Sequence, residues 1–244
     1  MRLHRFYIEE KLRDLPAGRQ VQIFDEAILH QMKNVFRLEV GDKVIFFDGQ
    51  EKERGKDYEC NIELLSKKEG KFIVEKINEN FIPERKVTLY ISLIKKENFE
   101  LTIEKATELG VSKIVPIITE RVQKKNIDLD RCRRIIKEAS EQCGRGDLPE
   151  IIEPMNLEEI FTEDVSNLIA FDMSGENFKT YQLINLPRRQ AGLKTYQLLI
   201  GPEGGWSDEE LNIFKDKKIK MYSLGNTVLR AETAAIVASA FVLN

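Results

Sequence analysis

Three glycines cluster where a buried strand is expected to end, in the run Gly201-Pro202-Glu203-Gly204-Gly205. The apolar stretch Tyr196–Ile200 precedes this run, and Ser207 with Glu210 three positions later has the pattern of a capping box that opens a helix. Glycine lets a ligand approach the backbone closely, and open α/β sheets bind ligands at the carboxyl ends of their strands. An ordinary tight turn would need only one glycine. The spacing therefore predicts a ligand site at this loop.

A second strand end places two opposite charges at the start of an apolar helix. Met221–Leu224 is followed by Gly225 and a short loop, and Arg230 and Glu232 lie where a C-terminal helix is expected to begin at about Ala231. The rest of that helix is almost wholly apolar, so it must be buried in the core or against another subunit. Charges at the head of a buried helix are costly to desolvate without a ligand or partner. Helix capping is the alternative, but the arrangement favours a second part of the functional site.

Motifs of several common enzyme classes are missing from the 244 residues. There is no G-x-S-x-G, no G-x-x-x-x-G-K-[ST] and no G-x-G-x-x-G after a strand, which argues against a hydrolase, a P-loop nucleotidase and a Rossmann dinucleotide enzyme. With only His4 and His30, a histidine-centred metal site or a Ser-His-Asp triad in the larger domain is unsupported. We therefore expect a site that uses neither a metal nor a histidine base.

The composition indicates a folded protein of the reducing cytoplasm. The apolar fraction of 42% is sufficient for a buried core, and no run of about 18 apolar residues is available to span a bilayer. The N-terminal segment has no apolar core of a signal peptide. Three cysteines without C-x-x-C spacing indicate neither a disulfide framework nor a zinc site. We expect a cytoplasmic protein with no membrane or metal partner.

Charge is distributed unevenly along the chain, although the net charge is only −3. Eight Lys or Arg residues against four Asp or Glu lie between Arg121 and Arg145, whereas seven acidic and no basic residues lie between Gly146 and Ala170. A basic surface beside an acidic one is compatible with a polyanion-binding face. Two solvated helix faces of opposite sign would give the same pattern, so charge alone leaves both interpretations open.

The pattern of apolar residues predicts two domains that meet near residues 79–85. The first is rich in strands and contains one helix between Asp25 and Arg37, which favours a small β-barrel. Its expected strands are Asp42–Gly49, Tyr58–Leu65 and Lys71–Ile77. The second alternates strands with helices, which predicts a mostly parallel sheet covered on both faces. Its further expected elements are the strands Val87–Leu93, Lys113–Ile118, Glu150–Glu153 and Leu168–Met173 and the helices Phe99–Leu109 and Leu129–Cys143.

The two glycine-ended loops resemble the cofactor loops of the RsmE family, the 16S ribosomal RNA uridine-N3 methyltransferases of the SPOUT (trefoil-knot) superfamily. The resemblance rests on Gly201–Gly205 and on Leu224-Gly225 followed by Leu229-Arg230-Ala231-Glu232-Thr233-Ala234. It extends over nearly the whole chain, because further segments match the family's pattern in the same order. These segments are Met1–Tyr7, His30–Gly49, Glu104–Val111 and Glu138–Arg145.

This resemblance implies an α/β fold in which residues 84–244 form a SPOUT methyltransferase domain with a mostly parallel sheet and a deep trefoil knot. Residues 1–76 would form a PUA-like RNA-binding β-barrel domain. The implied protein is a cytoplasmic homodimer that binds S-adenosyl-L-methionine and methylates N3 of a specific uridine in 16S rRNA of the small ribosomal subunit.

The resemblance also implies roles for individual residues. Arg230 would stabilise the negative charge that develops on the uracil carbonyl oxygens, and Glu232 would take the N3 proton or hold Arg230 in place. The RNA contacts, mainly to phosphates, would be Arg5, Arg37, Arg121, Gln142 and Arg145. The cofactor-binding residues would be Phe171, Leu199, Ile200, Gly201, Glu203, Gly204, Leu224, Gly225, Val228, Leu229, Arg230 and Thr233.

Some positions depart from the family's pattern. Cys132 stands where the family often has an aromatic residue, the stretch Leu186–Leu193 resembles a loop insertion, and Phe171 lies in a loose match. Two other functions stay open. One is a SPOUT methyltransferase that acts on a ribose 2′-hydroxyl or another base, which analysis of the modified nucleoside would separate. The other is a non-catalytic RNA-binding or ribosome-assembly protein, which would have no need of Arg230 and Glu232.

Overall fold

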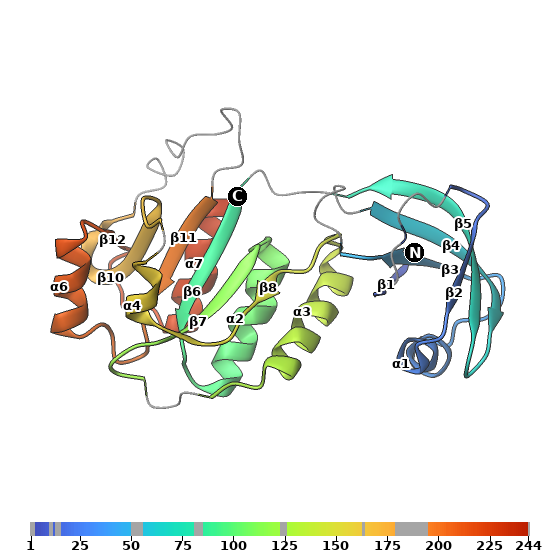
Figure 1. Cartoon of the computed structure of the whole chain (residues 1–244), viewed down its shortest axis with the longest axis horizontal. Coiled ribbons are helices and arrows are strands. Elements are labelled where there is room, and N and C mark those ends of the chain that lie inside the picture. Colours follow the sequence, from blue (N-terminus) through green and yellow to red (C-terminus); the bar gives the residue numbers. More distant parts are fainter. Residues whose placement is uncertain are drawn as a thin grey trace. The chain divides into compact units, whose positions relative to one another are not determined.

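The computed structural model describes residues 3–9, 12, 16–49, 56–80, 85–122, 126–162, 164–178 and 195–243. The chain divides into two compact units (Figure 1). Unit 1 comprises Met1–Ile82 with Ser140–Leu148, and unit 2 comprises Pro83–Ala139 with Pro149–Asn244. The expected boundary near residues 79–85 falls at this division. The segment Ser140–Leu148, however, belongs to unit 1, although the expected range 84–244 includes it.

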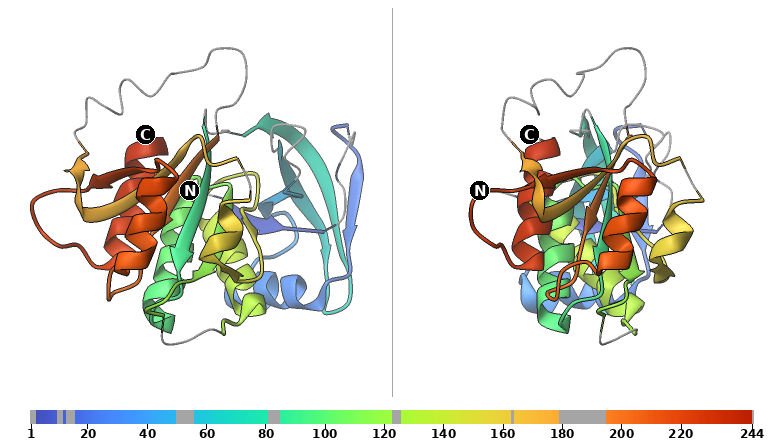
Figure 2. Two further views of the ribbon diagram at one scale, coloured as in Figure 1. Left: turned by 60° about the vertical axis from the view of Figure 1, so that its left-hand side comes forward. Right: turned by 90° about the vertical axis from the view of Figure 1, so that its left-hand side faces the viewer.

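Unit 1 is built on a five-stranded mixed sheet with the strand order β1-β3-β4-β5-β2. Its strands are β1 (His4–Tyr7), β2 (Gln20–Ile23), β3 (Lys43–Phe47), β4 (Lys56–Leu65) and β5 (Gly70–Glu79). β1 pairs with β3 in parallel, and the remaining pairs are antiparallel. Figure 2 shows the long strands β4 and β5 bending together along their length.

One helical segment of unit 1 packs against this sheet. It starts as α1 (Glu26–His30), where the Asp25 carboxylate accepts hydrogen bonds from two backbone N–H groups, and continues as the π-helix η1 (Gln31–Val35). The buried Leu29 and Met32 join the phenylalanines of the sheet in one core. Sequence periodicity predicted one helix here, and the change to a π-helix was not foreseen. The segment ends at Arg37, a non-glycine residue at φ 55°.

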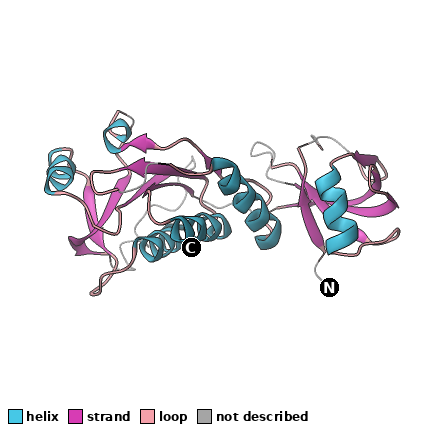
Figure 3. Cartoon of the chain, turned by 90° about the horizontal axis from the view of Figure 1, so that it is seen from below, coloured by secondary structure: helices cyan, strands magenta, loops and turns pink. Residues whose placement is uncertain are grey.

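Unit 2 contains a sheet of parallel strands in the order β12-β10-β11-β6-β7-β8, with β9 also paired to β7. Its strands are β6 (Lys86–Ser92), β7 (Lys113–Ile118), β8 (Glu150–Ile151), β9 (Met155–Asn156), β10 (Leu168–Asn177), β11 (Thr195–Ile200) and β12 (Lys220–Ser223). Its helices are α2 (Lys96–Leu109), α3 (Leu129–Cys143, whose last four residues fall in unit 1), α4 (Leu157–Ile160), α6 (Asp208–Asp216) and α7 (Ala231–Leu243). Figure 3 shows helices on both faces of this sheet.

The predicted α/β class with a mostly parallel sheet is confirmed in unit 2. Gly110 ends α2 at φ 101°, which is the left-handed conformation expected of a glycine C-cap. The short strands β1, β2 and β9 and the one-turn helix α4 were not predicted. The trefoil knot stays a prediction, and the proposed insertion Leu186–Leu193 lies outside the described residues. Among the described residues, no helix is both long and apolar enough to cross a bilayer.

Arg5 is a buried centre of contacts within unit 1. Its Nη2 lies 2.6 Å from Oδ1 of Asp57 and 3.2 Å from the carbonyl oxygen of Arg145, and its guanidinium lies over the ring of Phe47. Only 4% of the Arg5 side chain is exposed. Burial raises the pKa of the Asp57 carboxyl, and the positive charge of Arg5 opposes this shift. The ion pair therefore joins β1 to β4, and the hydrogen bond from Arg5 to the Arg145 carbonyl holds the segment Ser140–Leu148 against the sheet.

Replacing Arg5 by alanine should destabilise the protein by about 3–5 kcal/mol, because Asp57 would be left as a buried and unpaired charge. Lys43→Ala is the matched control, since it removes an ion pair to Glu75 in which the lysine is 44% exposed. We expect no measurable change in that variant. Urea denaturation of the two variants would compare them, and equal stabilities would show that the Arg5 pair does not hold unit 1 together.

Candidate functional site

A cavity of about 410 Å³ opens in unit 2 where β11 and β12 end, beside β10. It is large enough for a small organic ligand of nucleoside size. Both loops singled out by their glycines border it, together with the middle of β10. The lining residues are Phe171, Asp172, Met173, Ile200, Gly201, Pro202, Glu203, Gly204, Gly205, Trp206, Leu224, Thr227, Val228, Leu229, Arg230, Ala231 and Ala234.

The indole of Trp206 supports the first loop from behind. A Cβ atom at Gly201 would lie 2.9 Å from Cε2 of this indole, so only glycine fits there without displacing it. The indole Nε1 donates a hydrogen bond of 3.1 Å to the carbonyl of Phe171, and the ring packs edge-on against Phe214 of α6. Trp206 is buried, so the loop rests on a fixed aromatic platform.

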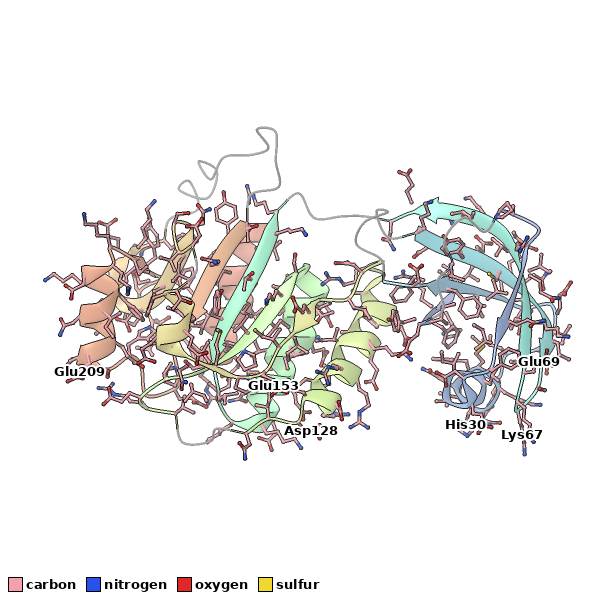
Figure 4. The ribbon with its side chains drawn as sticks, viewed as in Figure 1. His30, Lys67, Glu69, Asp128, Glu153 and Glu209 are labelled. Carbon is pink, nitrogen blue, oxygen red and sulfur yellow. The ribbon has the colours of Figure 1, made fainter. Side chains whose placement is uncertain are left out.

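Glu210 ties this loop to the end of β7. The capping box is confirmed, because Oε2 of Glu210 accepts from the Ser207 N–H at 2.8 Å and the Ser207 hydroxyl accepts from the Glu210 N–H. The other oxygen of the carboxylate, Oε1, accepts from the N–H of Glu120 at 2.9 Å. Glu210 is buried, whereas its neighbour Glu209 points away from the protein at the outer edge of α6 (Figure 4).

Two further contacts hold the glycine loop in unit 2. The N–H of Lys95, which follows β6, donates to Oε1 of Glu203 at 3.2 Å. Arg121, which follows β7, extends over Gly204 and donates from Nη1 to the Gly204 carbonyl at 2.8 Å. The ends of β6, β7 and β11 are therefore joined through a single loop, whose remaining backbone faces the cavity.

The second loop brings Arg230, but not Glu232, to the cavity. Arg230 lines it and is exposed, whereas Glu232 is 7% exposed and is absent from the lining. Among the described residues, Oε2 of Glu232 has no hydrogen-bond partner and no ion pair joins Glu232 to Arg230. The spacing in sequence suggested that Arg230 and Glu232 act together in the site. In the structure only Arg230 lines the cavity, and Glu232 is buried outside the lining.

Nine of the expected cofactor residues line the cavity, and Leu199, Gly225 and Thr233 do not. Leu199 is fully buried in the sheet. The expected site did not include Asp172 and Met173, which lie in the loose family match from which only Phe171 was assigned. It also left out Trp206, Thr227 and the first alanines of α7. Trp206 could have been found from the sequence, because it is an aromatic residue directly after the glycine run.

The expected RNA contacts fall into two groups. Arg37, Arg121 and Gln142 are exposed. Arg5 is buried in its contacts with Asp57, and the Arg145 guanidinium makes two hydrogen bonds, of 2.9 and 2.7 Å, to the carboxylate of Asp147. These two arginines are thus already engaged within unit 1. Neither presents a free guanidinium to a phosphate in this structure.

The two buried cysteines, Cys60 and Cys132, are not activated nucleophiles. Burial raises the pKa of Cys60 to about 12 and that of Cys132 to about 11, so both stay protonated thiols at neutral pH. Cys132 lines a separate cavity of about 160 Å³ beside Phe99 of α2. No group of three or more His, Cys, Asp or Glu side chains in the described part of the chain is arranged to hold a metal ion.

The chain is similar to known methyltransferases over nearly its whole length. Residues 82–243 match the family model of an RNA methyltransferase domain. The chain is 28% identical to ribosomal RNA small subunit methyltransferase E of Rickettsia conorii, covering 99% of this chain and 96% of that protein. It is 32% identical to the protein of the same name from Aquifex aeolicus, covering 78% and 82%.

Solved structures show the same similarity. Ribosomal RNA small subunit methyltransferase E of Neisseria gonorrhoeae, bound to S-adenosyl methionine, superposes with a TM-score of 0.81 at 25% identity, covering 98% of this chain and 96% of that one. A Legionella pneumophila structure in complex with the bound cofactor SAM has a TM-score of 0.83 at 29% identity, covering 99% and 97%.

The Trp206 platform can be tested with two glycine variants. Gly201→Ala should destabilise the protein by about 1–3 kcal/mol, because the new methyl group overlaps the indole. Gly204→Ala should be tolerated, since its Cβ would lie 3.5 Å from Cδ of Arg121, an ordinary van der Waals distance. Thermal unfolding followed by tryptophan fluorescence would compare the variants. Equal melting temperatures would contradict the proposed support of the loop by Trp206.

Proposed function

This chain belongs to the ribosomal RNA small subunit methyltransferase E family, and from that membership we propose that it transfers the methyl group of S-adenosyl-L-methionine to N3 of a specific uridine in 16S rRNA. The observation that carries the proposal is the cavity. It lies inside the region that the family model matches, and both loops that the sequence resemblance identified as cofactor loops border it.

The cavity suits S-adenosyl-L-methionine. Its volume of about 410 Å³ is adequate, the backbone of Gly201–Gly205 is open to it, and Ile200, Leu224 and Leu229 provide apolar contacts for an adenine ring. The remaining expected cofactor residues, Leu199, Gly225 and Thr233, are proposed to act through the backbone or from behind the lining. When bound, the cofactor supplies an electrophilic methyl group.

The chemistry requires uracil N3 to lose its proton as it attacks the methyl carbon. Negative charge then develops on the flanking carbonyl oxygens, which a fixed guanidinium can stabilise. We assign this role to Arg230, because it is the cationic side chain in the cavity lining. Glu232 is proposed either to accept the proton or to orient Arg230. Both roles require the start of α7 to rearrange, since Glu232 does not line the cavity as it stands.

Recognition of the RNA is assigned to exposed polar groups of both units. Arg37 and Gln142 of unit 1 and Arg121 of unit 2 are accessible for phosphate contacts, which position a substrate without reading its sequence. Arg5 and Arg145 support this surface through their internal contacts. We propose that unit 1 is the PUA-like RNA-binding domain and unit 2 the knotted SPOUT domain, and that the protein acts in the cytoplasm, where small ribosomal subunits are made.

A homodimer is proposed because α7 is apolar on all sides but only partly covered. Ile236, Val237 and Phe241 are only half-buried, and Val228 in the preceding loop is 80% exposed. Sedimentation should give twice the chain mass of 28.3 kDa, and Val237→Glu should give the single-chain mass. Val40→Glu, at a valine of unit 1 that is 64% exposed, is the control and should remain dimeric. A monomeric wild-type protein would refute the dimer.

The proposed reaction can be tested by incubating small ribosomal subunits that lack the modification with labelled S-adenosyl-L-methionine. Digestion to nucleosides and mass spectrometry should give label in N3-methyluridine alone. Label on a ribose or another base would favour the alternative SPOUT activities. Absence of label would favour a non-catalytic RNA-binding protein.

In the same assay, Arg230→Ala should lower turnover about 100-fold or more while cofactor affinity changes little, by comparison with other charge-stabilising donors. Lys220→Ala is a suitable control, since Lys220 is exposed on β12 and is absent from the cavity lining. Wild-type turnover in the Arg230 variant would remove this residue from the mechanism.

A further inference from the structure

β10 leaves its regular pairing next to the cavity. It pairs with β12 as far as Phe171 and resumes at Glu176, with a register shift between the two. Gly175 lies within this irregular stretch, and a Cβ there would come within 2.6 Å of the Tyr222 backbone, so the close approach requires glycine. Bulges of this kind re-aim side chains beside functional sites. Here the stretch brings Asp172 into the cavity lining.

The Asp172 carboxylate is held in one orientation. Its Oδ1 accepts hydrogen bonds from the backbone N–H of Ser174 at 2.8 Å and from the Ser174 hydroxyl at 2.6 Å. Among the described residues, Oδ2 has no partner. The side chain is half-buried. One carboxylate oxygen is thus fixed, and the other stays available as an acceptor.

The second acid of the lining is differently engaged. Glu203 directs Oε1 to the backbone N–H of Lys95 and so belongs to the contacts that hold the glycine loop. Among the described residues, no hydrogen bond joins Asp172 to that loop. Both acids therefore keep one carboxylate oxygen without a hydrogen-bond partner among the described residues, and Asp172 is the one whose carboxylate is fixed by its own strand rather than used to hold the loop.

Register places Asp172 beside the glycine loop. Phe171 pairs with Ile200, so the next residue of β10 lies alongside Gly201 on the neighbouring strand. In dinucleotide-binding α/β folds, a carboxylate that follows the glycine loop in sequence accepts a hydrogen bond from the ribose hydroxyl. In this chain the carboxylate precedes the glycine loop in sequence, and strand register brings it beside that loop. Building on the proposed function, we propose that Asp172 recognises the ribose hydroxyls of the cofactor, with Ser174 as its positioning residue.

The proposal is tested by removing the Asp172 carboxylate and the ribose hydroxyls of the ligand, separately and together. Binding of S-adenosyl-L-homocysteine and of its 2′,3′-dideoxy analogue would be measured by calorimetry on wild type and on Asp172→Ala. A hydrogen bond to a charged group corresponds to about a ten- to hundred-fold change in affinity. Wild type should prefer the natural ligand by that factor, and Asp172→Ala should bind both ligands about equally.

Asp164→Ala is the matched control. Asp164 accepts the N–H of Ser166 two residues on, in the same local geometry, but lies outside the cavity, so the preference of wild type should persist. Asp172→Asn keeps the side-chain volume and should retain the fold if the alanine variant does not. Its preference for the natural ligand should be weaker than that of wild type.

Two results would overturn the assignment. In one, Asp172→Ala keeps the full preference for the ribose hydroxyls. In the other, Asp172→Ala binds 5′-methylthioadenosine, which has the ribose but no amino acid, as tightly as wild type does, which would place the carboxylate at the amino-acid end of the cofactor. In either case wild type still binds the cofactor and methylates RNA, so the proposed function stands. A wild-type protein that binds none of these ligands refutes both proposals.

Discussion

The glycine loop after β11 can face a ligand only because side chains hold it from behind. Its backbone must stay open to the cavity, so few of its own groups are available to fix it. The Trp206 indole, the Glu210 carboxylate and the Arg121 guanidinium supply this support, and they connect the loop to the middle of β10 and to the end of β7. The parallel sheet matters to function mainly because it brings these strand ends to one edge.

A different interaction organises unit 1. Arg5, which is buried and paired with Asp57, also donates to the Arg145 carbonyl and so joins the sheet to Ser140–Leu148, a segment distant in sequence. Arginine suits this position because its planar guanidinium can donate to several acceptors at once. The family resemblance assigned Arg5 to RNA binding, whereas in this structure its guanidinium is buried and bonded to groups of unit 1. Gln142 on the same segment is exposed, so the proposed RNA contact of this segment rests on that side chain.

The sequence predicted the structure best at positions where the type of residue and its local spacing determine the local conformation. The capping box at Ser207, the C-cap at Gly110 and the helix Leu129–Cys143 follow directly from local rules, and the two glycine loops located the cavity. Contacts between residues that are brought together only by the tertiary structure could not be predicted from the sequence. The irregularity of β10 that exposes Asp172, the burial of Arg5 and the separation of Glu232 from Arg230 arise from strand register and helix direction, which periodicity does not report.

A crystal structure of the protein with S-adenosyl-L-homocysteine would test the account most directly. It should show the ligand in the cavity between the Gly201–Trp206 loop and the Leu224–Arg230 loop, with the contacts of Trp206, Glu210 and Arg121 unchanged. The preformed support of the loop makes this the expected result. A ligand bound elsewhere, or a glycine loop that must leave its side-chain supports to admit it, would contradict the account.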